Sequence, residues 1–264
     1  MVVKSNIMPH YLSIGGCFKN EAHCIVEWVE HYLLHGVDHI YLVNDGSTDD
    51  SVEKLQPYID RGVVTLFNEI NHPYYLGRQR NFYNVHFMPI LRAKETEWLF
   101  ICDLDEFLWS EIDTDLKKVF KMCEHLSQIQ FVVTLFGSNG HIKQPESLVE
   151  SFTKRSADLE TPQPKCVKYA VRSKYNWSSL NVHHADWVEG EVEAGTFIKM
   201  REPYFRVNHY SCQSREFWDV VKCTRGDADN YITRLPEHFS VYDHNDVEDM
   251  GLVNQNRQLR ESRP

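Results

Sequence analysis

Several features that would place the chain in a common protein class are missing from its 264 residues. There is no run of about 18 apolar residues, the length that a membrane-spanning helix needs. The N-terminus lacks the charged and apolar regions of a signal peptide. No basic patch occurs, and 28 basic against 38 acidic residues give a net charge of −10. We therefore expect a soluble, cytoplasmic protein without a membrane span or a nucleic-acid partner, unless the chain is an excised catalytic domain.

The cysteines argue against two further classes. Their number, seven, is odd, and no two of them form a C-x-x-C pair. A disulfide framework or a zinc knuckle would require paired cysteines at regular spacings. Several of the cysteines lie inside apolar runs, where a free thiol behaves as a small hydrophobic side chain. The sequence therefore predicts reduced, buried thiols.

Strand and helix patterns alternate along the first hundred residues. Apolar runs predict strands at 11–18, 39–43, 63–67 and 98–102, and helical patterns lie between them at 22–35, 51–58 and 77–93. Elements that alternate over short connections favour an α/β fold, with a mostly parallel central sheet flanked by helices. The helical pattern at 77–93 contains Pro89, which predicts a kink or two separate pieces.

The second half of the chain is less regular. Its patterns predict strands at 130–136, 166–171 and 181–184, and helices at 147–155 and 214–222. The tail after residue 240 is polar and acidic, and we expect it to be loosely ordered. No repeat or interdomain linker is visible, so we expect one domain over residues 1–264.

An acidic motif follows the fourth predicted strand. The apolar run 98–102 ends in Asp103-Leu104-Asp105. Residues two apart on an extended backbone point to the same side, and hard cations prefer oxygen ligands, so the pair could hold a divalent cation and, through it, a diphosphate. The polar segments 19–21 and 44–45 end two other predicted strands. We expect all three strand ends to meet at one edge, where ligands of parallel sheets bind.

Segments in a fixed order carry a family resemblance. The chain resembles glycosyltransferases of the GT-A fold, in the family-two-like group, through Phe18-Lys19-Asn20-Glu21, Asn44-Asp45-Gly46-Ser47-Thr48-Asp49, Arg80-Asn81 and Asp103-Leu104-Asp105. It looks closest to the branch related to glycosyltransferase family ninety-two through residues 135–141, Asn208-His209-Tyr210 and Ser214-x-Glu216-Phe217. The resemblance covers roughly residues 12–229, with about 11–110 as a nucleotide-binding half, about 111–240 as an acceptor-binding half and 241–264 as a tail.

The resemblance implies a transferase of hexosyl or deoxyhexosyl type. Its donor would be a nucleotide sugar, with a UDP-sugar favoured, its cofactor Mn²⁺ or Mg²⁺, and its acceptor a carbohydrate or glycoconjugate. The implied nucleotide contacts are Glu21, Asp45, Arg80 and Asp103, and the implied metal ligands are Asp103, Asp105 and His209. Phe136, Gly137 and Ser138 would border the acceptor, which one of the adjacent histidines, His184, would also face. Arg225 could bring a cation to the phosphates, with Lys222 and Arg172 as rivals.

Transfer with inversion, which we favour over retention, needs a base that reaches the attacking hydroxyl. Asp186 and Glu189 lie in the region where inverting relatives place that base. Relatives often have an acidic pair there, whereas this chain has His184-Ala185-Asp186-Trp187. The base therefore stays open among Asp186, which ranks first, Glu189, Asp227 and Asp243.

Each candidate also has a structural interpretation. Asp103 and Asp105 could cap a strand end, and Asp45 with Gly46 is a strong turn dipeptide. Glu21 suits the first turn of a helix, and a lone histidine such as His209 is more often a structural hydrogen-bonding residue.

Two other functions compete: a nucleotidyltransferase or phosphohydrolase with the same metal–diphosphate site, and a non-catalytic carbohydrate-binding scaffold. The sequence lacks the glycine- and lysine-rich phosphate loop typical of the first.

Overall fold

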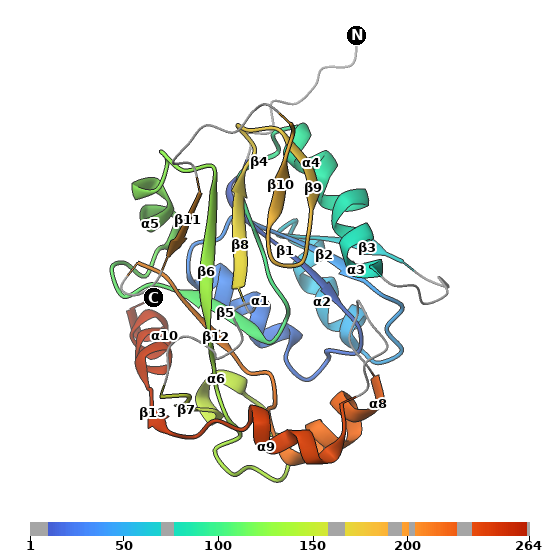
Figure 1. Cartoon of the computed structure of the whole chain (residues 1–264), viewed down its shortest axis with the longest axis vertical. Helices are drawn as coiled ribbons and strands as arrows, with labels where there is room; N and C mark the ends of the chain where they lie inside the picture. The colour runs from blue at the N-terminus through green and yellow to red at the C-terminus, as the bar shows by residue number, and fades with distance from the viewer. Residues whose placement is uncertain are drawn as a thin grey trace.

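The computed structural model describes residues 10–69, 77–157, 167–189, 197–200, 204–225 and 234–262, with only the backbone described at 197–200 and 225. Its main feature is a nine-stranded sheet in the order β3-β2-β1-β4-β8-β6-β12-β5, with β11 paired to β6 (Figure 1). Helices flank this sheet on both faces. The α/β class expected from the sequence is therefore confirmed.

The first half of the chain forms the parallel part of the sheet. Its strands are β1 (His10–Phe18), β2 (His39–Asn44), β3 (Val64–Asn68) and β4 (Thr96–Ile101), and its connections are α1 (Ile25–Leu34), α2 (Ser51–Asp60) and the segment α3 (Arg78–Phe82), η1 (Tyr83–Phe87) and α4 (Met88–Arg92). The expected interruption of the third connection occurs as the π-helical turn η1, and Pro89 follows it as the second residue of α4.

The second half adds mixed strands and short helices. They are β5 (Glu106–Trp109), α5 (Leu116–Met122), β6 (Gln128–Leu135), α6 (Leu148–Ser151), β7 (Lys154–Arg155), β8 (Val167–Arg172), β9 (Trp177–Leu180), β10 (Ala185–Trp187), β11 (Phe197–Met200), β12 (Arg206–His209), α7 (Arg215–Phe217), η2 (Trp218–Lys222), α8 (Cys223–Arg225), η3 (Pro236–His238), α9 (Phe239–Tyr242), β13 (Val247–Glu248) and α10 (Gly251–Ser262). Strand β8 runs antiparallel to both β4 and β6, whereas β12 is parallel to β6 and antiparallel to β5. In the described part of the chain, no helix has the length and apolar character needed to cross a bilayer.

Two predicted elements are wrong. Residues 181–184 are the turn of the hairpin β9–β10, closed by the Asn181 amide donating to the His184 carbonyl at 2.8 Å. The predicted helix at 147–155 ends at Ser151, and the chain then forms β7, which pairs with β13 near the C-terminus. Both errors concern short segments whose structure depends on a partner elsewhere in the chain.

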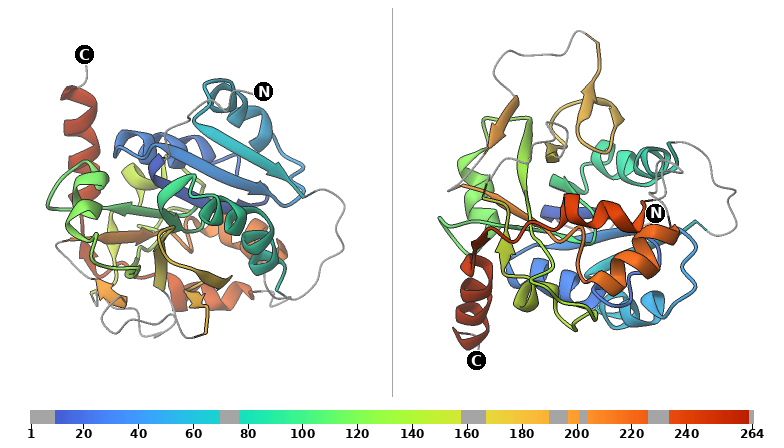
Figure 2. Two further views of the ribbon diagram at one scale, coloured as in Figure 1. Left: turned by 90° about the horizontal axis from the view of Figure 1, so that it is seen from above. Right: turned by 60° about the horizontal axis from the view of Figure 1, so that its bottom comes forward.

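The sheet separates two apolar cores, because neighbouring residues of a strand point to opposite faces. One face packs against α1 and α2 through Leu12, Ile14, Ile40, Leu42, Trp98 and Phe100. The other packs against α3, η1 and α4 through Tyr41, Val43, Leu99 and Ile101. Figure 2 shows these two sets of helices on opposite sides of the parallel strands. All six cysteines with described positions are free thiols; four of them are buried as expected, whereas Cys17 and Cys223 are only partly buried.

The expectation of a loosely ordered tail is also wrong. Residues 251–262 form α10, which lies on the side of the molecule away from β3 (Figure 2). Leu252 and Val253 are buried in the first core, and the Asn256 side chain lies 2.8 Å from Nε2 of His35, the residue that directly follows α1. The tail is polar because only one stripe of this helix faces the protein.

Two buried histidines predict an acid-sensitive fold. Burial lowers the pKa of His31 well below its ordinary value and that of His39 to about 4. In the unfolded chain both titrate near pH 6.5, so below that pH only the unfolded state binds these protons. Stability should therefore decrease as the pH falls from 6.5 towards 4, by about 1.4 kcal/mol per pH unit for each histidine at most. Urea unfolding across this range would measure the decrease.

The variant His39→Gln isolates one of these contributions. Nε2 of His39 lies 2.8 Å from Oγ1 of Thr65, and glutamine offers a polar group there that does not titrate. The difference in stability between wild type and variant should then change with pH in the stated direction. An identical pH dependence of the two proteins would contradict the prediction.

Candidate active site

Three polar strand ends meet at one edge of the sheet, as the sequence predicts. Strand β1 lies between β2 and β4 and is parallel to both. Beyond the paired residues the Asp45 amide donates to the Phe18 carbonyl at 2.8 Å, and the Cys102 amide donates to the Gly15 carbonyl at 3.1 Å. Residues 19–21, 44–45 and 103–105 therefore follow neighbouring strands, at the edge where α/β proteins bind ligands.

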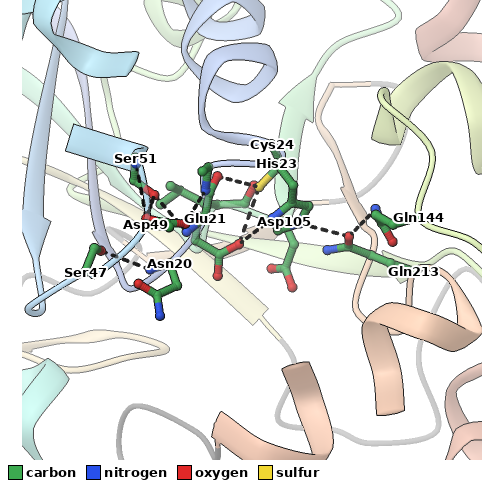
Figure 3. Close-up of polar contacts among 12 residues, drawn as sticks. Asn20, Glu21, His23, Cys24, Ser47, Asp49, Ser51, Asp105, Gln144 and Gln213 are labelled. Carbon is green, nitrogen blue, oxygen red and sulfur yellow. Dashed lines mark hydrogen bonds and ion pairs between the residues drawn. The ribbon is translucent and has the colours of Figure 1, made fainter. Parts of the chain in front are cut away.

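The loop after β1 is tied to the loop after β2 (Figure 3). Asn20 has a φ of 55°, in the left-handed region that asparagine tolerates better than most residues. Its amide donates to Oγ of Ser47 at 3.0 Å, and the Glu21 amide donates to Oγ of Ser51 at 3.0 Å. The carboxylate of Glu21 lies 3.5 Å from Sγ of Cys24. These contacts fix Glu21 beside the strand ends, where a nucleotide contact remains a prediction.

Asp45 forms a buried ion pair with Arg78, the first residue of α3. Asp45 is 5% exposed and Arg78 is 6% exposed. The predicted nucleotide contact Arg80 is exposed, and it donates to Oγ of Ser179 in β9 at 3.0 Å. Successive helical residues are about 100° apart, so residues 78 and 80 face different sides. The structure thus brings Arg78, which the sequence analysis missed, to the strand ends.

The acidic motif is a tight turn between β4 and β5, not the extended backbone assumed from the sequence. The Glu106 amide donates to the Asp103 carbonyl at 3.1 Å, and the Asp103 amide donates to Oε2 of Glu106 at 2.9 Å. The carboxylate of Asp103 accepts from Nε2 of Gln79 at 3.0 Å and from Nζ of Lys168 at 2.6 Å. Lys168 also lies 3.2 Å from Oε2 of Glu106. The turn therefore directs Asp103 towards Lys168.

Asp105 points instead to His209, which a different part of the chain supplies. Strands β5 and β12 pair with Glu106 opposite His209. Nε2 of His209 is 3.4 Å from Asp105 Oδ1, and Nδ1 is 3.6 Å from Glu106 Oε1. One potential ligand atom from each of Asp105, Glu106 and His209 lies within 4.8 Å of the others. The structure thus brings together two of the predicted metal ligands, adds Glu106, and leaves Asp103 outside this cluster.

Nearby charges set the ionisation of this cluster. Burial would raise the pKa of Asp105, but Lys222, with Nζ 3.1 Å from Oδ2, and His209 hold it well below its usual range. Burial raises the pKa of Glu106 despite the opposite effect of Lys168. Burial alone would lower the pKa of His209, but Asp105 and Glu106 raise it. Asp105 is therefore held in its ionised form, which favours a positively charged group or ion beside it.

The predicted base and acceptor residues meet on the hairpin β9–β10. Oδ1 of Asp186 is 3.1 Å from Nε2 of His184, and Oδ2 accepts from Oγ of Ser179 at 3.0 Å and from Nδ2 of Asn181 at 2.9 Å. Arg80 also donates to Ser179, so this cluster joins α3 to the hairpin. The roles predicted for Asp186 and His184 remain predictions.

The turn of this hairpin lies beside the start of β8. Nδ1 of His183 donates to the Val167 carbonyl at 2.9 Å, and the Tyr169 hydroxyl donates to the Asn181 carbonyl at 2.6 Å. These two residues of β8 flank Lys168, which contacts the acidic turn. The hairpin is therefore connected to the acidic turn through β8.

The predicted acceptor segment 136–138 is packed under the C-terminal part of the chain. Phe136 is 1% exposed and Ser138 2% exposed, and the Ser138 amide donates to Oδ1 of Asp243 at 2.6 Å. A Cβ added at Gly137 would lie only 2.3 Å from the His244 carbonyl oxygen, so no other residue fits there without a backbone shift. Asp243, a candidate base, anchors this segment. Acceptor contacts from 136–138 remain a prediction.

The remaining candidates are Glu189, Arg225 and Asp227. Glu189 is exposed after β10. The side chain of Arg225 and all of Asp227 lie outside the described residues. Their predicted roles are untested.

Known proteins resemble this chain in sequence and in structure. A family 92 protein from rice (Oryza sativa subsp. japonica) is 24% identical over 249 residues, which cover 92% of this chain and 38% of that protein. A Staphylococcus aureus TarS structure (residues 1–349, with UDP) is 14% identical, with a TM-score of 0.43, over 95% of this chain and 70% of that one. Glucosyl-3-phosphoglycerate synthase from Mycobacterium tuberculosis, with Mn²⁺, UDP and glucosyl-3-phosphoglycerate, is 13% identical, with a TM-score of 0.34, over 62% and 57%.

The family match includes the strand ends and the acidic cluster. The sequence model of glycosyltransferase family 92 matches residues 9–250. This range begins just before β1 and ends just before α10. The chain therefore belongs to glycosyltransferase family 92.

Proposed function

We propose that the protein transfers a sugar, of hexosyl or deoxyhexosyl type, from a nucleotide-sugar donor to a hydroxyl group of a carbohydrate or glycoconjugate. We favour a UDP-sugar, a divalent Mn²⁺ or Mg²⁺ ion, and inversion at the anomeric carbon. The observation that carries the proposal is the meeting of Asp45, Asp103 and the cluster Asp105–Glu106–His209 at one sheet edge, in a family 92 chain.

The chemistry of the cluster fits a divalent cation. Asp105 and Glu106 offer oxygen and His209 offers nitrogen, a donor set that suits Mn²⁺. Among the described residues, Nδ1 of His209 is buried and makes no hydrogen bond. A divalent ion held there would offset charge on the departing diphosphate. Lys222, beside Asp105, would add a positive charge from the protein itself.

The other residues of the edge would bind and orient the substrates. The Asp45–Arg78 pair offers an acceptor next to donors, which suits the edge of a nucleobase. Asp103 is ionised, since Lys168 keeps its pKa low against the effect of burial, and it can accept a hydrogen bond from a ribose hydroxyl. Asp186, held by Ser179, Asn181 and His184, is our first choice for the base that takes the proton of the acceptor hydroxyl.

The nucleotide released from the donor tests this function. We would incubate the protein with Mn²⁺, a panel of UDP-, GDP- and dTDP-sugars and simple glycosides, then separate the nucleotides by chromatography. Transfer of the sugar breaks its bond to the diphosphate and releases a nucleoside diphosphate together with a new glycoside. The anomeric configuration of that glycoside, read by NMR, tests inversion.

The competing functions give different products. A phosphohydrolase that cleaves the diphosphate would release a nucleoside monophosphate and a sugar phosphate. In a parallel reaction supplied with pyrophosphate, a nucleotidyltransferase would convert the sugar nucleotide into a nucleoside triphosphate and a sugar phosphate. Either product in place of a glycoside would contradict the proposal.

A further inference from the structure

Lys168 is a charged residue in the middle of the sheet. It lies in β8, between β4 and β6, and is 3% exposed, with buried residues on both sides in the strand. A buried ammonium group is costly unless it is paired and hydrogen-bonded. Its Nζ lies 2.6 Å from Oδ2 of Asp103 and 3.2 Å from Oε2 of Glu106. Lys168 therefore contacts two carboxylates of the acidic turn from inside the protein.

These contacts decide which oxygen atoms of the turn face His209. Lys168 takes Oδ2 of Asp103, while Gln79 donates to Oδ1 at 3.0 Å. Oε2 of Glu106 is shared by Lys168 and the Asp103 amide, so Oε1 is the atom 3.6 Å from His209. The side chain of Asp103 nevertheless remains 36% exposed, so it can still accept a hydrogen bond from outside.

The charge of the turn also assigns a role to Lys168. The turn carries three carboxylates within a few residues, a concentration of charge that could hold two divalent ions. Lys168 offsets part of this charge from a fixed position in the sheet. The second lysine of the site, Lys222, differs because it contacts Asp105 from η2 at the edge, where its side chain is 13% exposed.

We propose that Lys168 is the positioning residue of the acidic turn, a built-in cation that takes the place of a second metal ion. It holds Asp103 as an acceptor for a donor hydroxyl and confines metal binding to one divalent ion at Asp105, Glu106 and His209. The proposal rests on the proposed function, because it concerns the metal site of that reaction. It assigns different tasks to the two aspartates of the motif by means of a residue about 65 positions away in the chain.

Counting bound Mn²⁺ ions tests the proposal. Titration with Mn²⁺ alone, with the free ion measured by electron paramagnetic resonance, gives the number of ions and their dissociation constants. Wild type should bind one ion. Lys168→Met should bind a second ion, because Asp103 and Glu106 lose their buried cation, and Lys168→Met/Asp103→Asn should return to one. Lys222→Met removes the same charge at the edge and should tighten binding without adding an ion.

Three outcomes would distinguish an error in the role of Lys168 from an error in the proposed function. If wild type binds one ion and Lys168→Met binds one ion with the same affinity, the role of Lys168 is wrong and the proposed function stands. If folded wild type binds neither Mn²⁺ nor a nucleotide, the proposed function itself fails. If Lys168→Met does not fold, the charge-balanced double variant should fold and bind one ion, and a double variant that stays unfolded would overturn the proposal.

The steady-state constants KM and kcat distinguish a positioning role of Lys168 from a purely structural one. In Lys168→Met the KM for the nucleotide sugar should rise about tenfold, because a misdirected Asp103 binds the donor less well. The kcat should change less, since Lys168 does not touch the reacting atoms. An unchanged KM in the folded variant, measured at saturating Mn²⁺, would contradict the positioning role.

Discussion

Asp105→Asn is expected to reduce sugar transfer about a thousandfold, because a divalent ion at the leaving group supplies several kcal/mol of transition-state stabilisation. Asp105 is the residue whose carboxylate both His209 and Lys222 approach. Asparagine keeps the shape of the side chain and removes its charge. The variant should therefore fold but hold Mn²⁺ poorly, and initial rates with a saturating nucleotide sugar would measure the loss.

A matched control is available in the connection between β5 and α5. Asp113 pairs with Lys118 at 3.0 Å in the surface segment that leads into α5. Asp113→Asn removes the same charge from the chain and should leave the rate within about twofold, since exposed ion pairs contribute little. Equal activity of Asp105→Asn and wild type at limiting Mn²⁺ would show that Asp105 does not bind the metal.

Arg78→Met is expected to have the second largest effect, on both stability and nucleotide binding. Breaking a buried ion pair by removing one partner costs about 3–5 kcal/mol, because the other charge stays buried. Asp45 would be that charge, since it is 5% exposed. In a chain of this length such a loss should lower the midpoint of thermal unfolding by about 10 °C. Differential scanning calorimetry would measure it.

Arg80→Met is the control, two residues further along the same helix. Arg80 is exposed and donates to Ser179 instead, so its loss should cost less than about 1 kcal/mol. A double variant Arg78→Met/Asp45→Asn should recover much of the stability but not the nucleotide binding. A larger effect at position 80 than at position 78 would restore the sequence-based assignment and refute the one from the structure.

The first half of the fold follows from the sequence because its signals are local. Each of the first four strands is a short apolar run, and the helices between them carry their own periodicity, so the edge with Asp45, Asp103 and Asp105 could be predicted. The pairing of β5 with β12 joins residues about 100 apart in sequence, and no local pattern encodes it. The place of His209 came from the family resemblance alone.

The missed residues are those whose role depends on tertiary contacts. Arg78 and Arg80 look alike in the sequence, and only the orientation of α3 separates them. Glu106 directly follows the acidic motif and could have been considered with it. The position of Lys168 is unusual, because a charged residue occurs inside the apolar segment Val167-Lys168-Tyr169-Ala170-Val171. This pattern predicts a buried partner for the lysine but not the identity of that partner.

The most direct test of the account is calorimetric titration of the wild type with UDP, GDP and dTDP, with and without Mn²⁺, repeated with Asp105→Asn. The account predicts that one nucleotide, UDP by preference, binds only when Mn²⁺ is present, and that Asp105→Asn loses this binding. If a folded wild type binds none of the three nucleotides, or binds one equally well without Mn²⁺ and in Asp105→Asn, the metal-dependent donor site assigned to this edge is wrong.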